Sequence, residues 1–161
     1  VLSSIYRAND SITISTPYFV PSEAIFDALC QAARRGVRVK VLIPQRNDSR
    51  MVSWASRAYF ERLLQSGGEI YLFAGGLLHT KAMLMDDQLA LVGSVNLDIR
   101  SLQLNFELTL TLFSPEACAS IRRLLDGYLQ DSTPLELERW KQRSRAARVL
   151  ERGMFFLSPL L

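Results

Sequence analysis

The sequence Val-Arg-Val-Lys-Val-Leu-Ile at residues 37–43 alternates three valines with two cations. A period of two is typical of a β-strand, with the valines on one face and the cations on the other. A second strand is expected over residues 11–19 (SITISTPYF), and a helix between the two over residues 21–35, which Gly36 ends. A strand, a helix and a strand joined by short links indicate a βαβ unit. Such a unit places its two strands parallel in one sheet.

The remaining elements follow from the same apolar periods and from start and stop signals. A hairpin is expected around Asp86-Asp87-Gln88, because strand patterns lie on both sides of these turn residues. Ser114-Pro115 and Thr133-Pro134 each combine a helix cap with a proline of the first turn, so both are predicted helix starts. Beyond residue 43 the predicted elements are a helix over 49–65, strands over 70–74, 79–85, 89–92 and 105–113, a helix over 114–129 and a last helix over 133–153.

The composition is that of one globular domain over residues 1–161, because about 150 residues is a typical length for a single core. Hydrophobic residues make up 48% of the chain and charged residues 22%, which are ordinary globular values and exclude a disordered protein. The net charge of +3 permits partners that carry phosphate without proving them. Cys30 and Cys118 form no metal-ligand pattern with the single histidine, so we expect buried reduced thiols and no metal site.

The two ends of the chain carry further signals. The sequence begins at Val1 without a methionine, so we expect it to be part of a longer protein, and it has no run of about 18 apolar residues that could span a membrane. The segment 133–161 combines a basic helix with the apolar tail 154–161 (MFFLSPLL). This segment either packs on the parent domain or a missing half, or lies against an anionic membrane with its arginines on phosphates.

His79 and Lys81 lie two residues apart on a predicted strand. A period of two puts both side chains on one face, about 7 Å apart along the chain. A lone histidine is more often structural, but a face that buries both groups needs a strong anionic partner. A phosphate is such a partner, because imidazole can attack phosphorus and the ammonium group can balance the charge on the non-bridging oxygens.

The residues after the second hairpin strand are candidate phosphate ligands. Gly93 allows a close backbone approach, and Ser94 and Asn96 offer a hydroxyl and an amide, although the same residue types also mark ordinary turns. Glu107 lies in a later strand pattern, where its carboxylate must reach solvent or pair with a cation. Pairing with His79 would fix the tautomer of the imidazole and stabilise the imidazolium.

The spacing His79-x-Lys81, then Asp86, then Gly93-Ser94-x-Asn96 resembles the HKD signature of the phospholipase D superfamily. The match is complete at every defined position, and Glu107 lies where that family carries an acid that hydrogen-bonds the catalytic histidine. Within the superfamily, the chain is similar to the C-terminal half of the bacterial cardiolipin synthases. This similarity is carried by residues 16–21, 96–101, 104–107 and 157–161.

The resemblance implies an α/β fold of the phospholipase D type: an α-β-α sandwich that is one half of a two-half enzyme, with a mixed, mostly parallel sheet and helices on both faces. It also implies a phosphatidyltransferase that joins two phosphatidylglycerols into cardiolipin and releases glycerol, without a metal or cofactor. One histidine forms a phosphohistidine, and the histidine of a second HKD motif moves the proton of the leaving and incoming alcohols.

The same resemblance assigns roles to single residues. The residues carried over are His79, Lys81, Asp86 and Glu107 as the catalytic set, and His79, Lys81, Ser94 and Asn96 as phosphate ligands. Glu107 is expected to orient His79. Asp86 has the opposite strand parity to Lys81 and borders the turn, so we expect it to support structure rather than touch phosphate.

A mechanism with two histidines needs a second HKD half, because this chain has only one such motif. The other half either precedes Val1 in the same polypeptide or comes from a second copy of the chain. In relatives with two motifs, the nucleophile is usually assigned to the first motif, which would make His79 the general acid and base. Tyr18 and Phe19, at the end of the first predicted strand, either line the rim of the site or pack in the core.

Two other functions compete with this interpretation. The first is an endonuclease of the same superfamily that works as a homodimer, and the second is a non-enzymatic half that binds phosphate or anionic lipid. The apolar tail and the small net charge speak against nucleic acid as a partner. The complete motif speaks against binding alone. The expected partners are phosphatidylglycerol and an anionic membrane surface, and the expected location is the bacterial cytoplasmic membrane.

Overall fold

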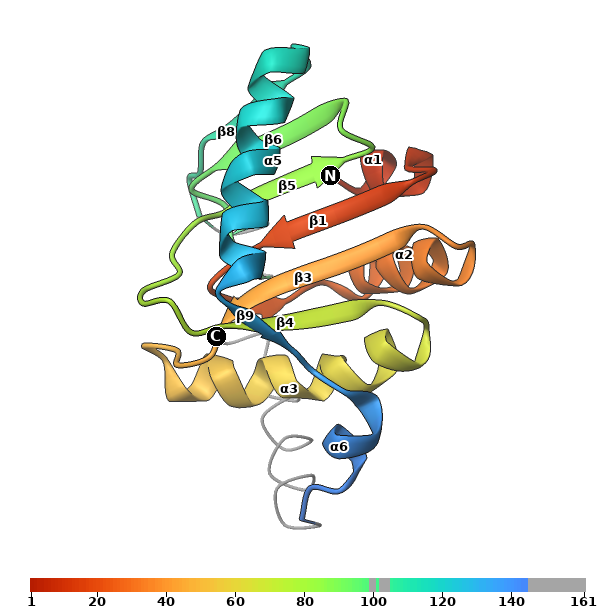
Figure 1. Ribbon diagram of the computed structural model, residues 1–161, viewed down its shortest axis with the longest axis vertical. Helices are drawn as coiled ribbons and strands as arrows, with labels where there is room; N and C mark the ends of the chain where they lie inside the picture. Colours follow the sequence, from red (N-terminus) through yellow and green to blue (C-terminus); the bar gives the residue numbers. More distant parts are fainter. Residues whose placement is uncertain (99–100, 102–104, 145–161) are drawn as a thin grey trace.

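A sheet between two layers of helices forms the protein in a computed structural model that describes residues 1–98, 101 and 105–144 (Figure 1). The strands are β1 (Ser11–Ser15), β2 (Phe19–Val20), β3 (Arg38–Pro44), β4 (Glu69–Phe73), β5 (Ala82–Met85), β6 (Leu89–Gly93), β7 (Leu97–Asp98), β8 (Thr109–Leu112) and β9 (Ser132–Pro134). The helices are α1 (Leu2–Arg7), α2 (Glu23–Arg34), α3 (Arg50–Gln65), α5 (Pro115–Gln130) and α6 (Leu137–Lys141).

The main sheet has the strand order β8-β6-β5-β1-β3-β4-β9, and β2 pairs with β7 in a small second sheet. β1 pairs in parallel with β3, and β3 with β4, so β1-α2-β3-α3-β4 makes two successive βαβ units. The pairs β1–β5, β5–β6, β6–β8 and β4–β9 are antiparallel. The predicted mixed sheet is therefore confirmed, with its three adjoining parallel strands flanked by antiparallel ones.

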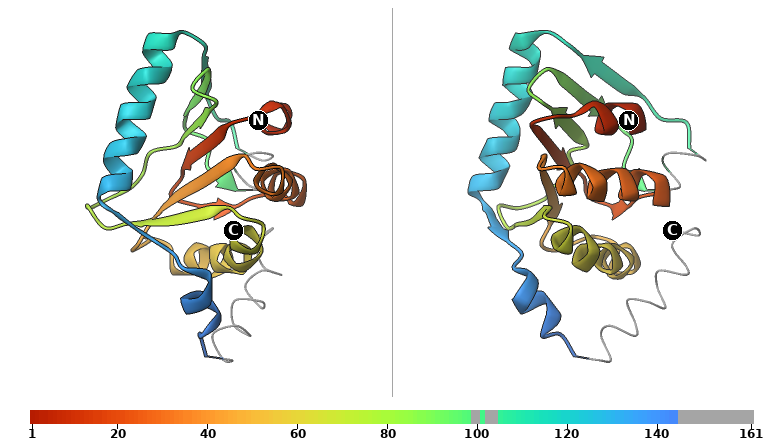
Figure 2. Two further views of the ribbon diagram at one scale, coloured as in Figure 1. Left: turned by 45° about the vertical axis from the view of Figure 1, so that its right-hand side comes forward. Right: turned by 90° about the vertical axis from the view of Figure 1, so that its right-hand side faces the viewer.

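Helices cover both faces of this sheet (Figure 2). α1, α2 and α3 lie on one face, where the larger core contains the fully buried Leu29, Val39 and Leu63. α5 crosses the other face and packs on β5 and β6 through Leu84 and Leu125. The predicted sandwich with helices on both sides is confirmed.

The helix starts follow the capping signals of the sequence. The Ser49 hydroxyl accepts the Val52 N–H at the start of α3, and the Ser114 hydroxyl accepts the Ala117 N–H at the start of α5. These bonds satisfy amide groups that have no partner within the helix. The sequence also predicted two buried free thiols, and both cysteines are buried and free.

The chain after α5 differs from its prediction. Thr133-Pro134 does not start a helix, because residues 132–134 form β9 and pair with β4. Proline fits there because β9 is an edge strand, where a missing N–H costs no ladder bond. The helix α6 begins only at Leu137. Residues 145–161, which include much of the predicted basic helix and the apolar tail, lie outside the described residues.

The predicted strand over residues 11–19 is two strands. β1 ends at Ser15, and Thr16 turns the chain by donating its hydroxyl to the Tyr18 carbonyl oxygen at 2.8 Å. Pro17 has no N–H to continue the ladder. The chain then pairs with another segment, because Phe19 lies beside Leu97 in the parallel pair β2–β7. This pairing brings β2 next to β7, which follows β6 in the sequence.

Several strand ends meet at one edge of the main sheet. The C-terminal ends of β1, β3, β4 and β6 lie there with the N-terminal ends of β5 and β8, as the pairs Ser15–Ala82 and Gly93–Thr109 require. β5 and β8 begin three and four residues later than predicted, at Ala82 and Thr109. Residues 79–81 and 105–108 therefore extend past this edge as loops rather than strands.

Gly93 is the position at this edge that tolerates no side chain. A Cβ atom there would overlap the Leu108 carbonyl oxygen and lie 2.9 Å from Thr109 Cα. We predict that Gly93→Ala forces β6 and β8 apart and lowers the free energy of unfolding by about 3 kcal/mol, as in an overpacked interior. Urea denaturation measures the loss. Gly127→Ala in α5 is the control, because nothing lies within 4 Å of that Cβ position. Equal midpoints for wild type and Gly93→Ala would contradict the close approach.

Candidate active site

The His79–Lys81 segment forms the centre of the site, and it precedes β5 instead of belonging to it. The expectation that both residues lie on a strand is wrong, because the neighbouring β1 ends at Ser15 and offers no ladder beyond Ala82. Other bonds hold the segment in place of the sheet. Ser15 donates its hydroxyl to the Thr80 carbonyl oxygen at 3.3 Å, and the Gly93 N–H donates to the Lys81 carbonyl oxygen at 3.2 Å.

The imidazole of His79 is open to solvent. It makes no hydrogen bond to any residue in the described ranges 1–98, 101 and 105–144. The backbone carbonyl oxygen of His79 accepts a hydrogen bond from the Lys81 ammonium group at 2.9 Å. An accessible imidazole with no partner is free to take or give a proton or to attack an incoming group.

Lys81 is half-buried beside the edge of the sheet. Burial lowers the pKa of its ammonium group, and the carboxylates of Glu107, Asp48 and Asp98 act in the opposite direction. A cation that has lost part of its water binds an anionic oxygen more strongly than an exposed cation does. Together with Gly93 and Asn96, Lys81 also lines a cavity of about 50 Å³. This cavity has room for a few water-sized groups.

Ser94 and Asn96 lie on the loop after β6, beside Lys81. Ser94 is fixed by three bonds to Leu108. Its N–H and its hydroxyl donate to the Leu108 carbonyl oxygen at 2.9 and 3.4 Å, and its hydroxyl accepts the Leu108 N–H at 3.0 Å. The Asn96 amide nitrogen donates to the Ser101 hydroxyl at 3.3 Å, while its Oδ1 is buried without a partner among the described residues. Turning the amide over would let Ser101 donate to Oδ1 and would place the Asn96 N–H groups where Oδ1 now lies.

Glu107 lies with Ser94 and Asn105 rather than with His79. The Asn105 amide donates to its carboxylate at 3.3 Å. Hydrogen bonds from Ser94 and Asn105, together with the charge of Lys81, hold the pKa of Glu107 below its usual value. The predicted hydrogen bond between Glu107 and His79 is not formed in this structure. The carboxylate instead fixes a serine and balances a lysine of the site.

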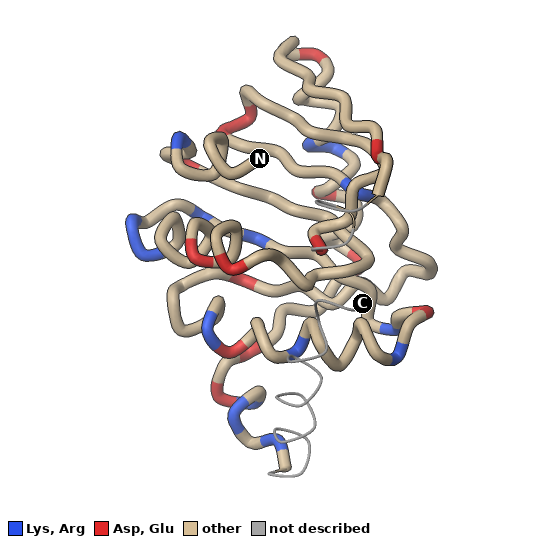
Figure 3. The backbone as a smooth tube through the Cα atoms, turned by 180° about the vertical axis from the view of Figure 1, so that it is seen from behind, with Lys and Arg blue, Asp and Glu red and all other residues tan. Residues whose placement is uncertain are grey.

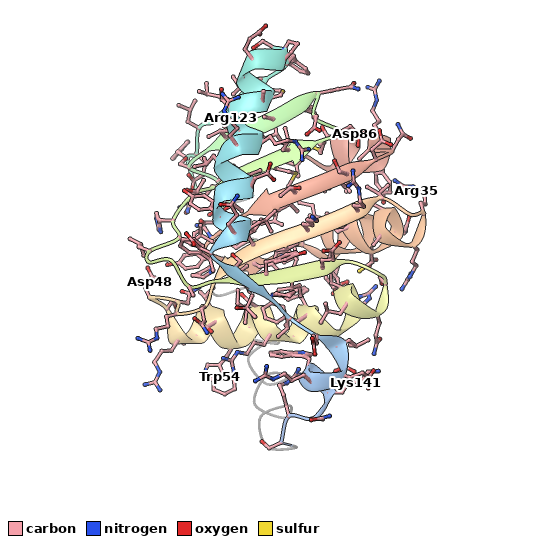
Figure 4. The ribbon with its side chains drawn as sticks, in the orientation of Figure 1. Arg35, Asp48, Trp54, Asp86, Arg123 and Lys141 are labelled. Atoms are coloured by element: carbon pink, nitrogen blue, oxygen red, sulfur yellow. The ribbon has the colours of Figure 1, made fainter. Side chains whose placement is uncertain are left out.

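Asp86 lies at the far end of β5 from this site. β5 runs four residues away from Lys81, which is about 13 Å, before the turn begins. Figure 4 places Asp86 and Asp48 at opposite ends of the strands. The Asp86 carboxylate accepts the N–H groups of Asn9, Asp10 and Ser11 at 2.8 to 2.9 Å. These bonds agree with the expectation that Asp86 supports structure.

The stability of the protein should depend on pH through Asp86. Partial burial by itself raises the pKa of this carboxyl, but the three N–H donors outweigh it and lower the pKa below the ordinary value of 3.8. A carboxylate with a lowered pKa stabilises the fold fully above its unfolded pKa, and this stabilisation is lost as pH falls through the folded value. Asp86→Asn should therefore cost about 2 kcal/mol at pH 7 and much less at pH 2 to 3.

Denaturant unfolding at pH 7 and at pH 3 measures this dependence. Asp126→Asn is a matched control, because Asp126 is exposed on α5 and makes no hydrogen bond or ion pair to another described residue. An Asp86→Asn variant that loses the same free energy at both pH values would contradict the role of the charge.

Two acidic residues of the site were not expected from the sequence. The Tyr18 hydroxyl donates to both carboxylate oxygens of Asp48 at 3.0 and 3.1 Å, and burial followed by this contact raises the pKa of Tyr18. Tyr18 thus packs its half-buried ring against the core and reaches Asp48 with its hydroxyl, while Phe19 is fully buried in the core. Asp98 is buried in β7 and accepts the Ser101 N–H at 2.6 Å. Its parity with Asn96, two residues earlier, is the one signal in the sequence that could have indicated it.

The arrangement as a whole suits phosphate chemistry. An accessible imidazole, a partly buried ammonium group and polar side chains on a tight loop lie at one edge of the sheet. Among the described residues, no group of three or more His, Cys, Asp or Glu is placed to hold a metal ion. The chemistry that these groups can supply is attack on phosphorus or proton transfer by His79, with charge balance from Lys81.

Several known proteins resemble this chain in sequence or in fold. Residues 1–129 match the family described as "Cardiolipin synthase, PLD-like domain". Cardiolipin synthase A of Yersinia pseudotuberculosis is 50% identical over all 161 residues, and the chain spans 33% of the length of that protein. Phosphatidylserine synthase from Haemophilus influenzae matches with a TM-score of 0.77 and 16% identity, over 99% of this chain and 43% of that one.

A smaller solved structure has a similar fold. Nuc, a phospholipase D family member from Salmonella typhimurium, matches with a TM-score of 0.72 and 24% identity, over 84% of this chain and 88% of that one. At these identities the two structural matches establish the fold alone. The family match covers most of the chain, and the curated relative matches all of it. The chain therefore belongs to the family of PLD-like domains of cardiolipin synthase.

Proposed function

We propose that this chain forms one half of the active site of a phosphatidyltransferase, which joins two phosphatidylglycerol molecules into cardiolipin and releases glycerol. The observation that carries the proposal is the placement of Lys81 and Asn96 around one cavity, with Ser94 and the open imidazole of His79 at the same edge of the sheet. The name of the Yersinia relative, cardiolipin synthase A, supports the choice of substrate.

Two displacements at phosphorus make up the proposed reaction. In the first, a histidine nitrogen attacks the phosphodiester of one phosphatidylglycerol, and the P–O bond to glycerol breaks as the second histidine protonates the glycerol oxygen. In the second, that histidine takes the proton from a hydroxyl of another phosphatidylglycerol. This hydroxyl attacks phosphorus, the P–N bond breaks and cardiolipin leaves. By the family pattern, His79 is the histidine that moves the proton.

The other groups stabilise the charge on the phosphate. Lys81 balances the negative oxygens, which carry more charge in the transition state than in the substrate. Ser94 and Asn96 hold the same oxygens through a hydroxyl and an amide. Glu107 accepts hydrogen bonds from Ser94 and Asn105 and balances the charge of Lys81. Asp86 stabilises the fold and takes no part in the reaction.

A second HKD half is part of this proposal, because two histidines are needed and the chain has one. The surface next to the site supports it. Four large apolar residues on β8 and its flanking segments are exposed: Phe106 (108%), Leu108 (69%), Leu110 (56%) and Phe113 (70%). Soluble proteins seldom leave such a run uncovered. A second half that covers the site would bury it.

The proposed partner outside the protein is an anionic membrane surface, in the bacterial cytoplasmic membrane. None of the described helices is long and apolar enough to span a bilayer. Acidic and basic residues are interspersed along the backbone trace in Figure 3. Such a distribution gives little support to a continuous basic groove of the kind that duplex nucleic acid requires.

The proposal is tested on the complete protein with vesicles of phosphatidylglycerol whose headgroup glycerol carries a radioactive label. The expected result is cardiolipin and free labelled glycerol in equal amounts. Release of phosphatidic acid without cardiolipin would make the protein a phospholipase. The absence of any turnover of the lipid would contradict the proposed function.

A further inference from the structure

The connection from β4 to β5, residues 74–81, carries the two central groups of the site without the support of a sheet ladder. Gly75, Gly76 and Leu77 are exposed in this connection. The residues on either side of His79 are not: Leu78 is 1% exposed, and Thr80 is half-buried. The chain is therefore anchored immediately before and immediately after the histidine.

One side chain, Tyr128, takes part in both anchors. Its ring packs against the small core that contains Leu78 and Phe73, and it meets the Phe73 ring edge-on at 5.3 Å between centroids. Its hydroxyl lies 2.8 Å from the Thr80 hydroxyl, which is hydrogen-bond distance. The apolar and the polar support of the histidine segment thus come from the same residue.

Tyr128 is itself held firmly. It lies in the last turn of α5, and its carbonyl oxygen accepts the Ser132 hydroxyl at 2.6 Å. The Ala74 N–H donates to the Asp131 carbonyl oxygen at 3.0 Å, and β9 then pairs with β4. Figure 1 shows the lower end of α5 running into β9 beside β4. The end of α5 and the start of the 74–81 connection are therefore fixed to each other.

The two sides of the sheet explain how this support reaches the site. On the side of the sheet that α5 covers, Thr80 bonds to Tyr128 of α5. Lys81 lines the cavity of about 50 Å³ together with Ile14 and Met83, and these two residues belong to the core on the opposite side of the sheet. Holding Thr80 toward α5 therefore turns Lys81 toward the cavity. Without the hydroxyl pair, the segment keeps its bonds from Ser15 and Gly93 but loses its polar attachment to α5, so the side chains on either side of Thr80 can shift.

We propose that Tyr128 is a positioning residue for His79 and Lys81, acting through its hydrogen bond to Thr80 and not through contact with substrate. The inference rests on the proposed phosphatidyl transfer. Misplacing reacting groups by about 1 Å can cost as much as a hundredfold in rate, so loss of one hydrogen bond in this segment should be measurable in turnover.

The test uses Tyr128→Phe, which keeps the ring and removes the hydroxyl, and Thr80→Val, which removes the other hydroxyl at nearly equal volume. In the complete protein, each should lower kcat about tenfold and leave KM for phosphatidylglycerol within about twofold. The double variant should be no slower than either single one, because both remove the same bond. Thr80→Ser keeps a hydroxyl and should retain wild-type kcat.

A merely structural role would give a different pattern. In rapid-quench experiments, a positioning role lowers the rate of glycerol release in the first turnover and leaves its amplitude, the fraction of active protein, unchanged. A structural role lowers the amplitude and leaves the rate unchanged. Tyr6→Phe is the matched control, because Tyr6 is an exposed tyrosine of α1 far from the site in sequence.

Three results would overturn the inference: a Tyr128→Phe kcat within twofold of wild type, a loss in amplitude only, or additive losses in the double variant. The proposed function fails in a different way. If the wild type makes no cardiolipin, or if His79→Ala retains turnover, the proposed reaction is wrong and the positioning role falls with it. If wild type and His79→Ala behave as proposed but Tyr128→Phe is fully active, only the positioning role is wrong.

Discussion

Replacing His79 with alanine should lower the rate of cardiolipin formation by about four orders of magnitude or more, the size of loss seen when a member of a catalytic unit is removed. His79 is the one histidine of the chain, so no other imidazole here can take over the proton transfer. The fold should not suffer. The side chain is exposed and makes no hydrogen bond within the described ranges, so the free energy of unfolding should change by less than about 0.5 kcal/mol.

Measuring turnover and urea unfolding on the same preparation separates these two effects. Gln88→Ala, an exposed change at the hairpin turn beyond the far end of β5, should leave both quantities unchanged. Turnover of His79→Ala at nearly the wild-type rate would show that the catalytic assignment of His79 is wrong.

Replacing Lys81 with methionine should give the second large loss, about two to three orders of magnitude in kcat/KM. Methionine keeps most of the side-chain volume and removes the charge that balances the phosphate oxygens. Burial already disfavours the charged form of Lys81. Removing this charge should therefore lower the free energy of unfolding much less than it lowers activity. Lys81→Arg keeps the charge with a different shape, and its activity should lie between those of wild type and Lys81→Met.

Lys40→Met is the matched control for this loss. Lys40 is half-buried like Lys81, but it lies within β3, and its ammonium nitrogen is 5.8 Å from the centroid of the Tyr71 ring. Its replacement should leave kcat/KM unchanged. A Lys81→Met variant within threefold of the wild-type kcat/KM would contradict the role of Lys81 as the phosphate cation.

Much of the fold follows from local signals in the sequence. The valine alternation of residues 37–43 and the caps at Ser49 and Ser114 act over a few residues, so they predict β3, α3 and α5 correctly. The strand β9 has no such local signal. Thr133-Pro134 is a good helix start in isolation, but pairing with β4 gives the backbone a better set of partners.

The sequence predicted which residues form the site better than it predicted how they are arranged. The HKD spacing identified the groups that gather at one sheet edge, but parity along a strand could not place His79 and Lys81, because β1 ends before it reaches them. The actual supports of the segment, Ser15 and Tyr128, come from positions 65 and 48 residues away in sequence. Contacts over such separations depend on the tertiary fold and leave no periodic pattern.

The proposed reaction consists of two successive displacements at phosphorus through a histidine, and the stereochemistry at phosphorus tests this sequence directly. A phosphatidylglycerol made chiral at phosphorus with oxygen isotopes or sulfur is converted by the complete protein, and the configuration of the product is determined by ³¹P NMR. Each displacement inverts the configuration, so two displacements should give net retention. Net inversion would mean a single direct transfer between lipids and would contradict the phosphohistidine mechanism.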